Sequence, residues 1–234
     1  MPVATERVSE YSMSFKVCTC LESNPAFGPR LAVDTSVTWQ TGQIISIGFI
    51  GGTDYQQHKV MEIASQWLHY ANLYFEWRSM TDVYKPIVRI AFQRGKGSWS
   101  YLGRDALMIQ RNKPTMNFGW LDESTPPDEW DRVVLHEFGH MLGCIHEHQS
   151  PAAGIKWDKP LLYQYYWETQ GWSKEQVNNN IIAKYDQDIS NTEFDSESIM
   201  LYPVEQRFTL DDFEVGWNRQ LSDTDKGFIA EVYP

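Results

Sequence analysis

The hydrophobic pattern of the first half of the chain changes between the strand period and the helix period. A β-branched run over residues 43–50 predicts a strand that ends at Gly51-Gly52. Alternation over residues 88–93 predicts a half-buried strand, and residues 115–119 are another short strand candidate. Residues 56–73 carry apolar side chains at helical spacing, namely Val60, Ile63, Ala64, Trp67, Leu68 and Ala71. This order predicts the start of a layered α/β unit.

Capping signals predict further helices in the second half of the chain. Thr125 as the cap, Pro126 in the first turn and Gly143 as a left-handed end predict one helix. Residues 173–176 and 222–225 each begin with serine and predict two more capped helix starts. The segment between these two starts is mostly irregular, and the C-terminal third has little strand signal. The fold class is therefore predicted to be α+β, a mixed α and β fold.

Breakers and length predict the domain organisation. Residues 1–30 are irregular, with breakers at Asn24-Pro25 and Gly28-Pro29, so we expect an N-terminal appendage before one domain over residues 31–234. A chain of 234 residues, 42% hydrophobic and 22% charged, is long enough to bury one large core. No apolar run approaches the roughly 20 residues that cross a bilayer, so no membrane partner is expected.

Charge and cysteine content exclude further classes of protein. A net charge of −11 argues against nucleic acid as a partner, because phosphate contacts need clustered lysine and arginine. Three cysteines, Cys18, Cys20 and Cys144, cannot form a framework of two or more disulfides. The polar segment 1–10 lacks the apolar stretch of a secretory signal. Either the protein is not exported conventionally or its signal has been removed.

Three histidines and a glutamate stand at the spacing of a zinc site. His136 and His140 are four residues apart, so they lie on one face of the predicted helix, one turn from each other, and can reach a single ion. Glu137 follows His136 and lies about 100° around the helix from it, where its carboxylate can reach a metal-bound water as a general base. Gly143 ends the helix and allows His146 to return as the third ligand. The fourth position stays open for water, and the pattern predicts one catalytic Zn²⁺.

The alternative to this metal site is a core helix that happens to carry histidines. Burying three imidazoles and a carboxylate without a metal would cost several kcal/mol in desolvation. The other helix-borne histidines, His58 and His69, have no partner ligand at a suitable spacing and are predicted to be structural or exposed. We therefore favour the metal site at His136, His140 and His146.

The zinc sequence and a downstream pentapeptide resemble those of the metzincin metallopeptidases. Residues 136–146, His-Glu-Phe-Gly-His-Met-Leu-Gly-Cys-Ile-His, match their extended zinc motif, and Ser198-Ile199-Met200-Leu201-Tyr202 is similar to their Met-turn. Glu147 after the third histidine, the Ser-Ile-Met-x-Tyr form of the turn and residues 97–103, Gly-Ser-Trp-Ser-Tyr-Leu-Gly, resemble the astacin family. The resemblance spans roughly residues 43–233.

The resemblance implies a zinc-dependent endopeptidase with Glu137 as the general base. It also implies that Met200 forms an apolar floor under the histidines. Tyr202 would be a fifth zinc ligand that moves away to hydrogen-bond the developing oxyanion, although a buried structural tyrosine is the alternative. The implied fold is a zincin domain cut by a cleft. Its N-terminal subdomain, a twisted sheet with two long helices, runs to about residue 146, and its mostly irregular and helical C-terminal subdomain covers residues 147–234.

The partner implied by this resemblance is a protein or peptide substrate that lies extended across the cleft. We expect the predicted strand at residues 115–119 to be the edge strand that pairs with it, through Thr115, Met116, Asn117, Phe118 and Gly119. We also expect the protein to be a monomer. A non-catalytic zinc-stabilised module that binds peptides is the main alternative, and Glu137 argues against it because such a module needs no carboxylate at the water. A zinc amidase or toxin with one intracellular target shares the chemistry and differs only in substrate.

The cysteines depart from the astacin pattern. The two disulfides usual in that family cannot form with three cysteines, which leaves the secretion implied by the resemblance open. Cys18 or Cys20 in the appendage, a possible prosegment, could occupy the open zinc position as a thiolate and hold the enzyme latent. The alternatives are a bridge to Cys144 and an ordinary free thiol.

Overall fold

One sheet carries the strands of the N-terminal half. The computed structural model describes residues 18–21, 37–183 and 193–234, and within them six strands form a sheet in the order β1-β5-β6-β4-β2-β3. The strand bounds are β1 Cys18–Leu21, β2 Ile44–Ile50, β3 Tyr74–Trp77, β4 Val88–Ala91, β5 Ser98–Tyr101 and β6 Met116–Asn117. Neighbouring strands are parallel except β5 and β6. Apart from β1, the appendage predicted over residues 1–30 lies outside the described residues.

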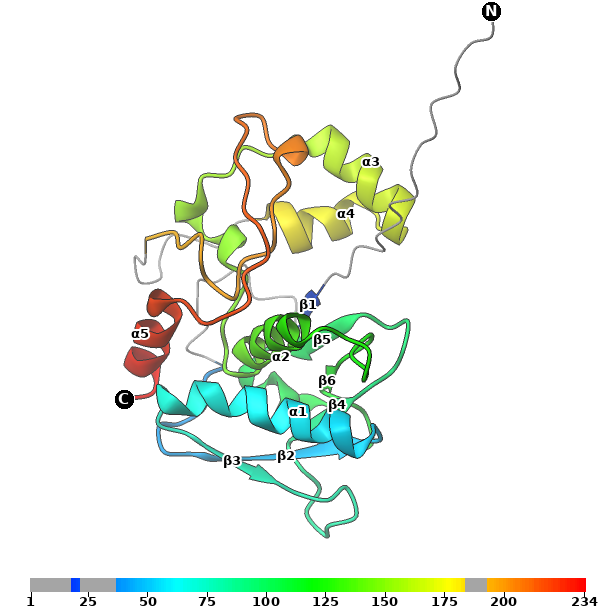
Figure 1. Ribbon diagram of the computed structural model, residues 1–234, viewed down its shortest axis with the longest axis vertical. Helices are drawn as coiled ribbons and strands as arrows, with labels where there is room; N and C mark the ends of the chain where they lie inside the picture. Colours follow the sequence, from blue (N-terminus) through cyan, green and yellow to red (C-terminus); the bar gives the residue numbers. More distant parts are fainter. Residues whose placement is uncertain (1–17, 22–36, 184–192) are drawn as a thin grey trace, which may run out of the picture.

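Two long helices cover one face of this sheet. α1 (Asp54–Ala64) and α2 (Pro127–Met141) pack against each other above the strands (Figure 1). α1 begins earlier than predicted because Thr53 and Gln56 form a capping box, and the chain continues after Ala64 as a short 3₁₀ helix, η1 (Ser65–His69). Trp67 in η1 is buried and donates its indole N–H to the carbonyl of Leu135 in α2, at 3.1 Å.

The central strand β4 is more deeply buried than its sequence predicts. The prediction of a half-buried strand is wrong because β4 lies between β2 and β6, and all four of its residues are buried. Its one charged residue, Arg89, is fully buried and donates to backbone carbonyls that include those of Lys113, Pro86 and Gln110. The alternating pattern had implied that water solvates the Arg89 side chain. In the structure backbone carbonyls accept its hydrogen bonds instead.

The prediction that residues 115–119 form a substrate-binding edge strand is also wrong. β6 pairs with β4 on one side and with β5 on the other, so Met116 and Asn117 lie inside the sheet, and Thr115, Phe118 and Gly119 flank this inner strand. Asn117 is buried, and its side-chain amide donates to the carbonyls of Gln93 and Gly97. The strand next to β6 on the outer side is β5, and β1 pairs with its other edge.

The zinc-motif helix begins one residue later than predicted, at Pro127. Thr125 does not cap α2, because the cap position is Pro126 and makes no side-chain bond to the helix. The Thr125 hydroxyl instead accepts from the backbone N–H of Asp122 at 2.9 Å and holds the preceding turn. The predicted end is confirmed, since Gly143 has a φ of 98° just after the helix.

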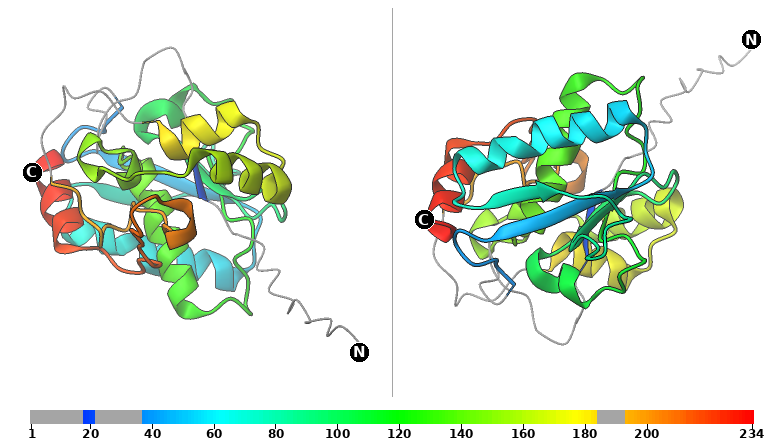
Figure 2. Two further views of the ribbon diagram at one scale, coloured as in Figure 1. Left: turned by 90° about the horizontal axis from the view of Figure 1, so that it is seen from above. Right: turned by 90° about the horizontal axis from the view of Figure 1, so that it is seen from below.

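The chain after α2 is mostly helical and irregular, as predicted. It contains α3 (Lys159–Gln170), α4 (Lys174–Val177) with a π-helical turn η5 (Asn178–Ile182), and α5 (Asp223–Val232). The short 3₁₀ helices are η2 (Gly103–Met108), η3 (Glu147–Gln149), η4 (Pro151–Ala153) and η6 (Gln206–Phe208). Ser173 and Ser222 cap α4 and α5 as predicted. α2 lies between the sheet and the part that carries α3 and α4 (Figures 1 and 2).

Among the described residues, no helix combines the length and the apolar character that a membrane span requires.

Candidate active site

The C-terminal half of α2 carries three of the predicted site residues in a buried position. His136, Glu137 and His140 are at most 2% exposed, and the two imidazole rings are 4.7 Å apart by their centroids. His136 Nδ1 lies 2.8 Å from the carbonyl oxygen of Ile199, and His140 Nδ1 lies 2.7 Å from that of Cys144. Because a carbonyl only accepts, each Nδ1 carries the hydrogen and each Nε2 presents a lone pair.

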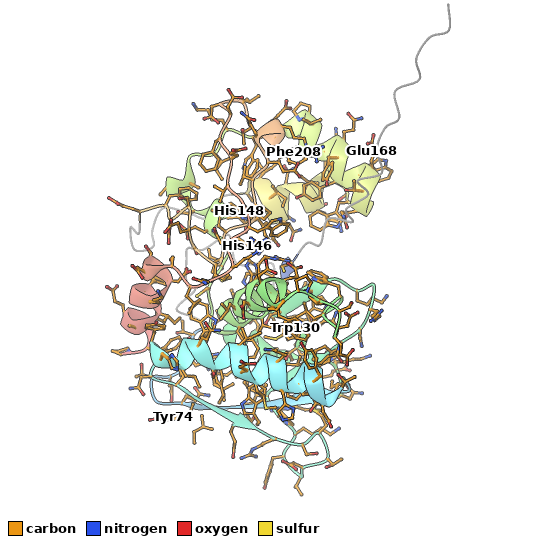
Figure 3. All side chains as sticks on the ribbon, viewed as in Figure 1. Tyr74, Trp130, His146, His148, Glu168 and Phe208 are labelled. Carbon is orange, nitrogen blue, oxygen red and sulfur yellow. The ribbon has the colours of Figure 1, made fainter. Side chains whose placement is uncertain are left out.

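The turn after α2 brings the third histidine back to the first two. With Gly143 in a left-handed conformation, the Gly143 N–H bonds the His140 carbonyl at 2.8 Å and the Cys144 N–H bonds the Gly139 carbonyl at 2.9 Å. The chain reverses, and the His146 ring lies 4.6 Å from the His140 ring. Figure 3 shows His146 between α2 and the part of the chain that carries α3.

The three imidazoles fit a single metal ion. One ligand nitrogen from each of His136, His140 and His146 lies within 4.8 Å of the others, and this is the only such group among the described residues. His140 Nε2 and His146 Nε2 face each other at 3.1 Å, and His136 Nε2 is buried with no hydrogen bond. Burial lowers the pKa of all three, that of His140 to about 4, which keeps the imidazoles neutral. Neutral nitrogens that converge in a dry site are what Zn²⁺ binds.

Glu137 lies beside this group with both carboxylate oxygens buried. Neither oxygen accepts a hydrogen bond of normal geometry among the described residues. Burial raises the pKa of Glu137 well above its usual value, while the neighbouring Cys18 thiol and the charge of Arg132 act in the opposite direction. A carboxylate with a raised pKa next to a metal site is suited to take up and return a proton.

Met200 packs against the same helix at Gly139. A Cβ on Gly139 would overlap the Met200 sulfur, so the glycine inside the zinc motif leaves the space that the methionine fills. The Met200 carbonyl accepts from the N–H of Glu147 at 3.1 Å, directly after the third histidine. The Met200 segment therefore contacts both the zinc helix and the turn that follows it.

Tyr202 is stacked among the histidines. Its ring centroid is 4.2 Å from that of His146 and 5.7 Å from that of His136, with interplanar angles of 38° and 14°. Its hydroxyl is buried and has no hydrogen bond among the described residues. Burial raises the pKa of Tyr202 well above its usual value, so the phenol keeps its proton and remains a donor.

Comparisons with known proteins identify the family of this chain. A structure of myroilysin is 46% identical, with a TM-score of 0.82, and the match covers 86% of this chain and 98% of that one. The chain belongs to the astacin family of zinc metallopeptidases. A second myroilysin structure is 43% identical, with a TM-score of 0.69, over 94% of this chain and 91% of that one. A scan against family models and a search of curated proteins gave no match.

The fold is shared with a more distant zinc protease. High choriolytic enzyme 1, a hatching enzyme zinc-protease from the medaka fish Oryzias latipes, is 16% identical, with a TM-score of 0.59. That match covers 88% of this astacin chain and 98% of the fish enzyme. As a member of the family with an intact histidine triad, this chain is a zinc-dependent endopeptidase that acts on proteins or peptides and uses one catalytic zinc ion.

The three cysteines of this astacin form no disulfide. The predicted alternative of a bridge from Cys18 or Cys20 to Cys144 is therefore wrong in this structure. Cys18 is buried, with its sulfur 3.9 Å from Arg132 Nη1 and beside Glu137. Cys20 is half-buried and packs against Leu102 and Ile145.

Sequence reasoning missed one histidine of the site. His148 is buried and stacks on Tyr202, with ring centroids 4.8 Å apart and an interplanar angle of 21°. Its Nε2 lies 3.1 Å from the Asn180 carbonyl in η5, so the ring is held between the site and the helical part after α2 (Figure 3). The only feature of the sequence that could have indicated His148 is its position two residues after His146. His58 is exposed on α1, with its Nδ1 2.7 Å from the Asp54 carbonyl, and it is not part of the metal group, as predicted.

Proposed function

We propose that this astacin hydrolyses peptide bonds with His136, His140 and His146 as zinc ligands and Glu137 as the general base. The observation that carries the proposal is the buried Glu137 carboxylate beside three imidazole lone pairs that converge on one point. When bound, zinc lowers the pKa of its water to about 7 and polarises the scissile carbonyl. Glu137 accepts the proton of that water and delivers it to the leaving amine, so no covalent intermediate is needed.

Tyr202 is the second catalytic residue in this proposal. Its phenol is protonated and buried beside His146, without another acceptor among the described residues. A donor of this kind can hydrogen-bond the oxygen on which negative charge develops, which stabilises the transition state more than the substrate. Tyr202 is also the candidate fifth zinc ligand, and Met200 is the candidate floor of the site.

The substrate is proposed to pair with the sheet at β5 rather than at β6. β1 occupies the outer edge of β5, in parallel register from Cys18 opposite Ser98 to Leu21 opposite Tyr101. An extended peptide that uses this edge must first displace β1. We also expect the chain to be a monomer, which light scattering on the purified chain would test.

Cys18 is the residue we propose to keep the intact chain latent. Its thiol is buried beside the general base, whereas Cys20 packs on the small apolar cluster of Leu102 and Ile145. In this proposal residues 1–30 act as a prosegment, residues 31–234 form the catalytic domain, and the Cys18 sulfur takes the open zinc position. The cleft between the N-terminal subdomain, to about residue 146, and the C-terminal subdomain would then be closed.

Two substitutions at neighbouring cysteines test the latency. Cys18→Ala is expected to raise the peptide hydrolysis of the intact chain, because the sulfur that blocks the site is removed. Cys20→Ala is the matched control, since it lies on the same strand and is expected to leave the activity unchanged. The latency proposal fails if Cys18→Ala has the activity of the wild type.

Glu137→Gln tests the catalytic assignment. Hydrolysis of a mixed peptide library is expected to fall by about 10²–10⁴-fold, the usual contribution of a general base, while the zinc content stays near one ion per chain. Both the intact chain and the Cys18→Ala background should be measured, so that latency does not hide the effect. Glu175→Gln on the exposed helix α4 is the control. A Glu137→Gln protein that keeps full activity would exclude Glu137 as the base.

A further inference from the structure

A buried aspartate on the C-terminal helix has more partners than a helix cap requires. Ser222 and Asp225 form a capping box at the start of α5: the Ser222 hydroxyl accepts from the Asp225 N–H, and the Asp225 carboxylate accepts from the Ser222 N–H, both at 2.9 Å. The Asp225 residue is only 8% exposed. A solvated cap needs no such burial, so the remaining contacts of this carboxylate are informative.

The same carboxylate holds the segment that contains Met200. Asp225 Oδ1 accepts from the Ser198 hydroxyl at 2.7 Å, and Asp225 Oδ2 accepts from the Ile199 N–H at 2.8 Å. The Ser198 hydroxyl in turn accepts from the Met200 N–H at 3.1 Å. α5, which is red in Figures 1 and 2, is thus bonded to a turn about 25 residues earlier in the chain. Both oxygens of the carboxylate are used.

Ile199 connects this network to the first zinc ligand. Its N–H is held by Asp225, and its carbonyl accepts from His136 Nδ1 at 2.8 Å. The direction of that carbonyl fixes both the tautomer and the rotation of the His136 ring, and the opposite nitrogen, Nε2, is the one that faces the metal position. Two hydrogen bonds through one residue therefore link a carboxylate on α5 to a ligand on α2.

We propose that Asp225 is a positioning residue of the zinc site, which acts through Ile199 to orient His136. The inference rests on the proposed role of His136 as a zinc ligand. Asp225 touches neither the metal position nor the substrate, so it adds no catalytic group. In this proposal Asp225 controls the orientation of His136 Nε2 toward the metal position, and through it the affinity for zinc.

The test compares zinc binding by the intact chain and two variants. In Asp225→Ala both carboxylate oxygens are removed, so the Ile199 N–H and the Ser198 hydroxyl lose their acceptor. We expect the zinc dissociation constant, measured by competition with a chelator, to rise by about 10–100-fold, as is usual when an outer partner of a ligand is lost. The visible absorption of the Co²⁺-substituted protein, which reports ligand geometry, is expected to change.

Ser222→Ala is the matched control. It removes the hydroxyl that caps α5 and that donates to Asp195 at 2.6 Å, while the bonds from Asp225 to Ser198 and Ile199 remain. It is expected to lower the melting temperature and keep the wild-type zinc affinity and Co²⁺ spectrum. The inference is overturned if folded Asp225→Ala binds zinc like the wild type, or if Ser222→Ala weakens zinc binding to the same degree. Failure of the proposed function is separate, since the wild type itself would then bind no more zinc than His136→Ala.

Discussion

A few buried neighbours determine the tautomer or the protonation state of each titratable residue of the site. Two carbonyls fix the tautomers of His136 and His140, burial keeps the imidazoles neutral, and burial raises the pKa of Glu137. Gly139, a glycine of the zinc motif, has a packing role. Gly139 faces the Met200 sulfur, so a single methyl group at this position would have to push the Met200 side chain aside.

Gly139→Ala tests this packing. The added methyl overlaps Met200, and we expect a loss of about 1–3 kcal/mol in the free energy of unfolding, as for other overpacked cores. Gly227→Ala is the control, because the position is exposed within α5 and a Cβ there meets nothing within 4 Å. The control is expected to be neutral or to stabilise by up to about 1 kcal/mol. Urea denaturation measures both, and equal effects of the two variants would contradict the packing argument.

At the scale of elements, the end of α2 is held by residues far away in the sequence. The last carbonyls of a helix have no partner inside it. Here the Met141 carbonyl accepts from the Trp39 indole at 2.8 Å, and the Leu142 carbonyl accepts from the Tyr233 hydroxyl at 2.6 Å. Tyr233, next to the last residue, also accepts from the Trp39 N–H at 3.3 Å. The turn toward His146 therefore starts from a helix end that is fully bonded.

Tyr233→Phe removes this contact without changing the ring. It leaves the buried carbonyl of Leu142 without its donor, so we expect the free energy of unfolding to fall by about 1–3 kcal/mol. Tyr74→Phe, at a position that is 58% exposed, is expected to change it by less than about 0.5 kcal/mol. Thermal denaturation followed by circular dichroism compares the two. A wild-type melting temperature for Tyr233→Phe would show that the helix end does not depend on this hydroxyl.

At the scale of the whole molecule, the zinc position lies where α2, the turn after it and the segment at Ile199 meet. The ligands come from α2 and from the turn after it, and the His136 ring is held by the segment at Ile199 that α5 supports. An ion that binds only the folded chain stabilises it in proportion to the logarithm of its concentration. Removal of zinc should therefore affect stability as well as activity.

Chelation measures this coupling. At free zinc 100-fold above its dissociation constant, we expect a stabilisation of about 2.7 kcal/mol, or roughly 5–11 °C in melting temperature for a chain of this size. The apoprotein should lose hydrolysis and recover it when zinc is returned. His136→Ala should show little of either response. A melting temperature of the wild type that is independent of zinc would mean that the histidines are not a metal site in the folded chain.

The sequence by itself determined the parts of this protein that depend on local spacing. The positions of His136, Glu137 and His140 follow from the helical period, and the return of His146 follows from the glycine that ends the helix. The serine caps of α4 and α5 were also predictable, because a capping box is complete within four residues. α3 was not predicted, although Asp158 caps it and Gly171 ends it, because its buried stripe is narrow.

Only the tertiary structure decided what depends on contacts between distant segments. The order of the strands placed β6 inside the sheet and gave the outer edge of β5 to β1, and no local pattern contains that order. β4 is buried on both faces despite its alternating sequence. Arg89 can be buried there because backbone carbonyls accept its hydrogen bonds. The partners of Asp225, Tyr233 and His148 arise in the same way. Hydrogen bonds between residues far apart in the chain form only after packing brings them together.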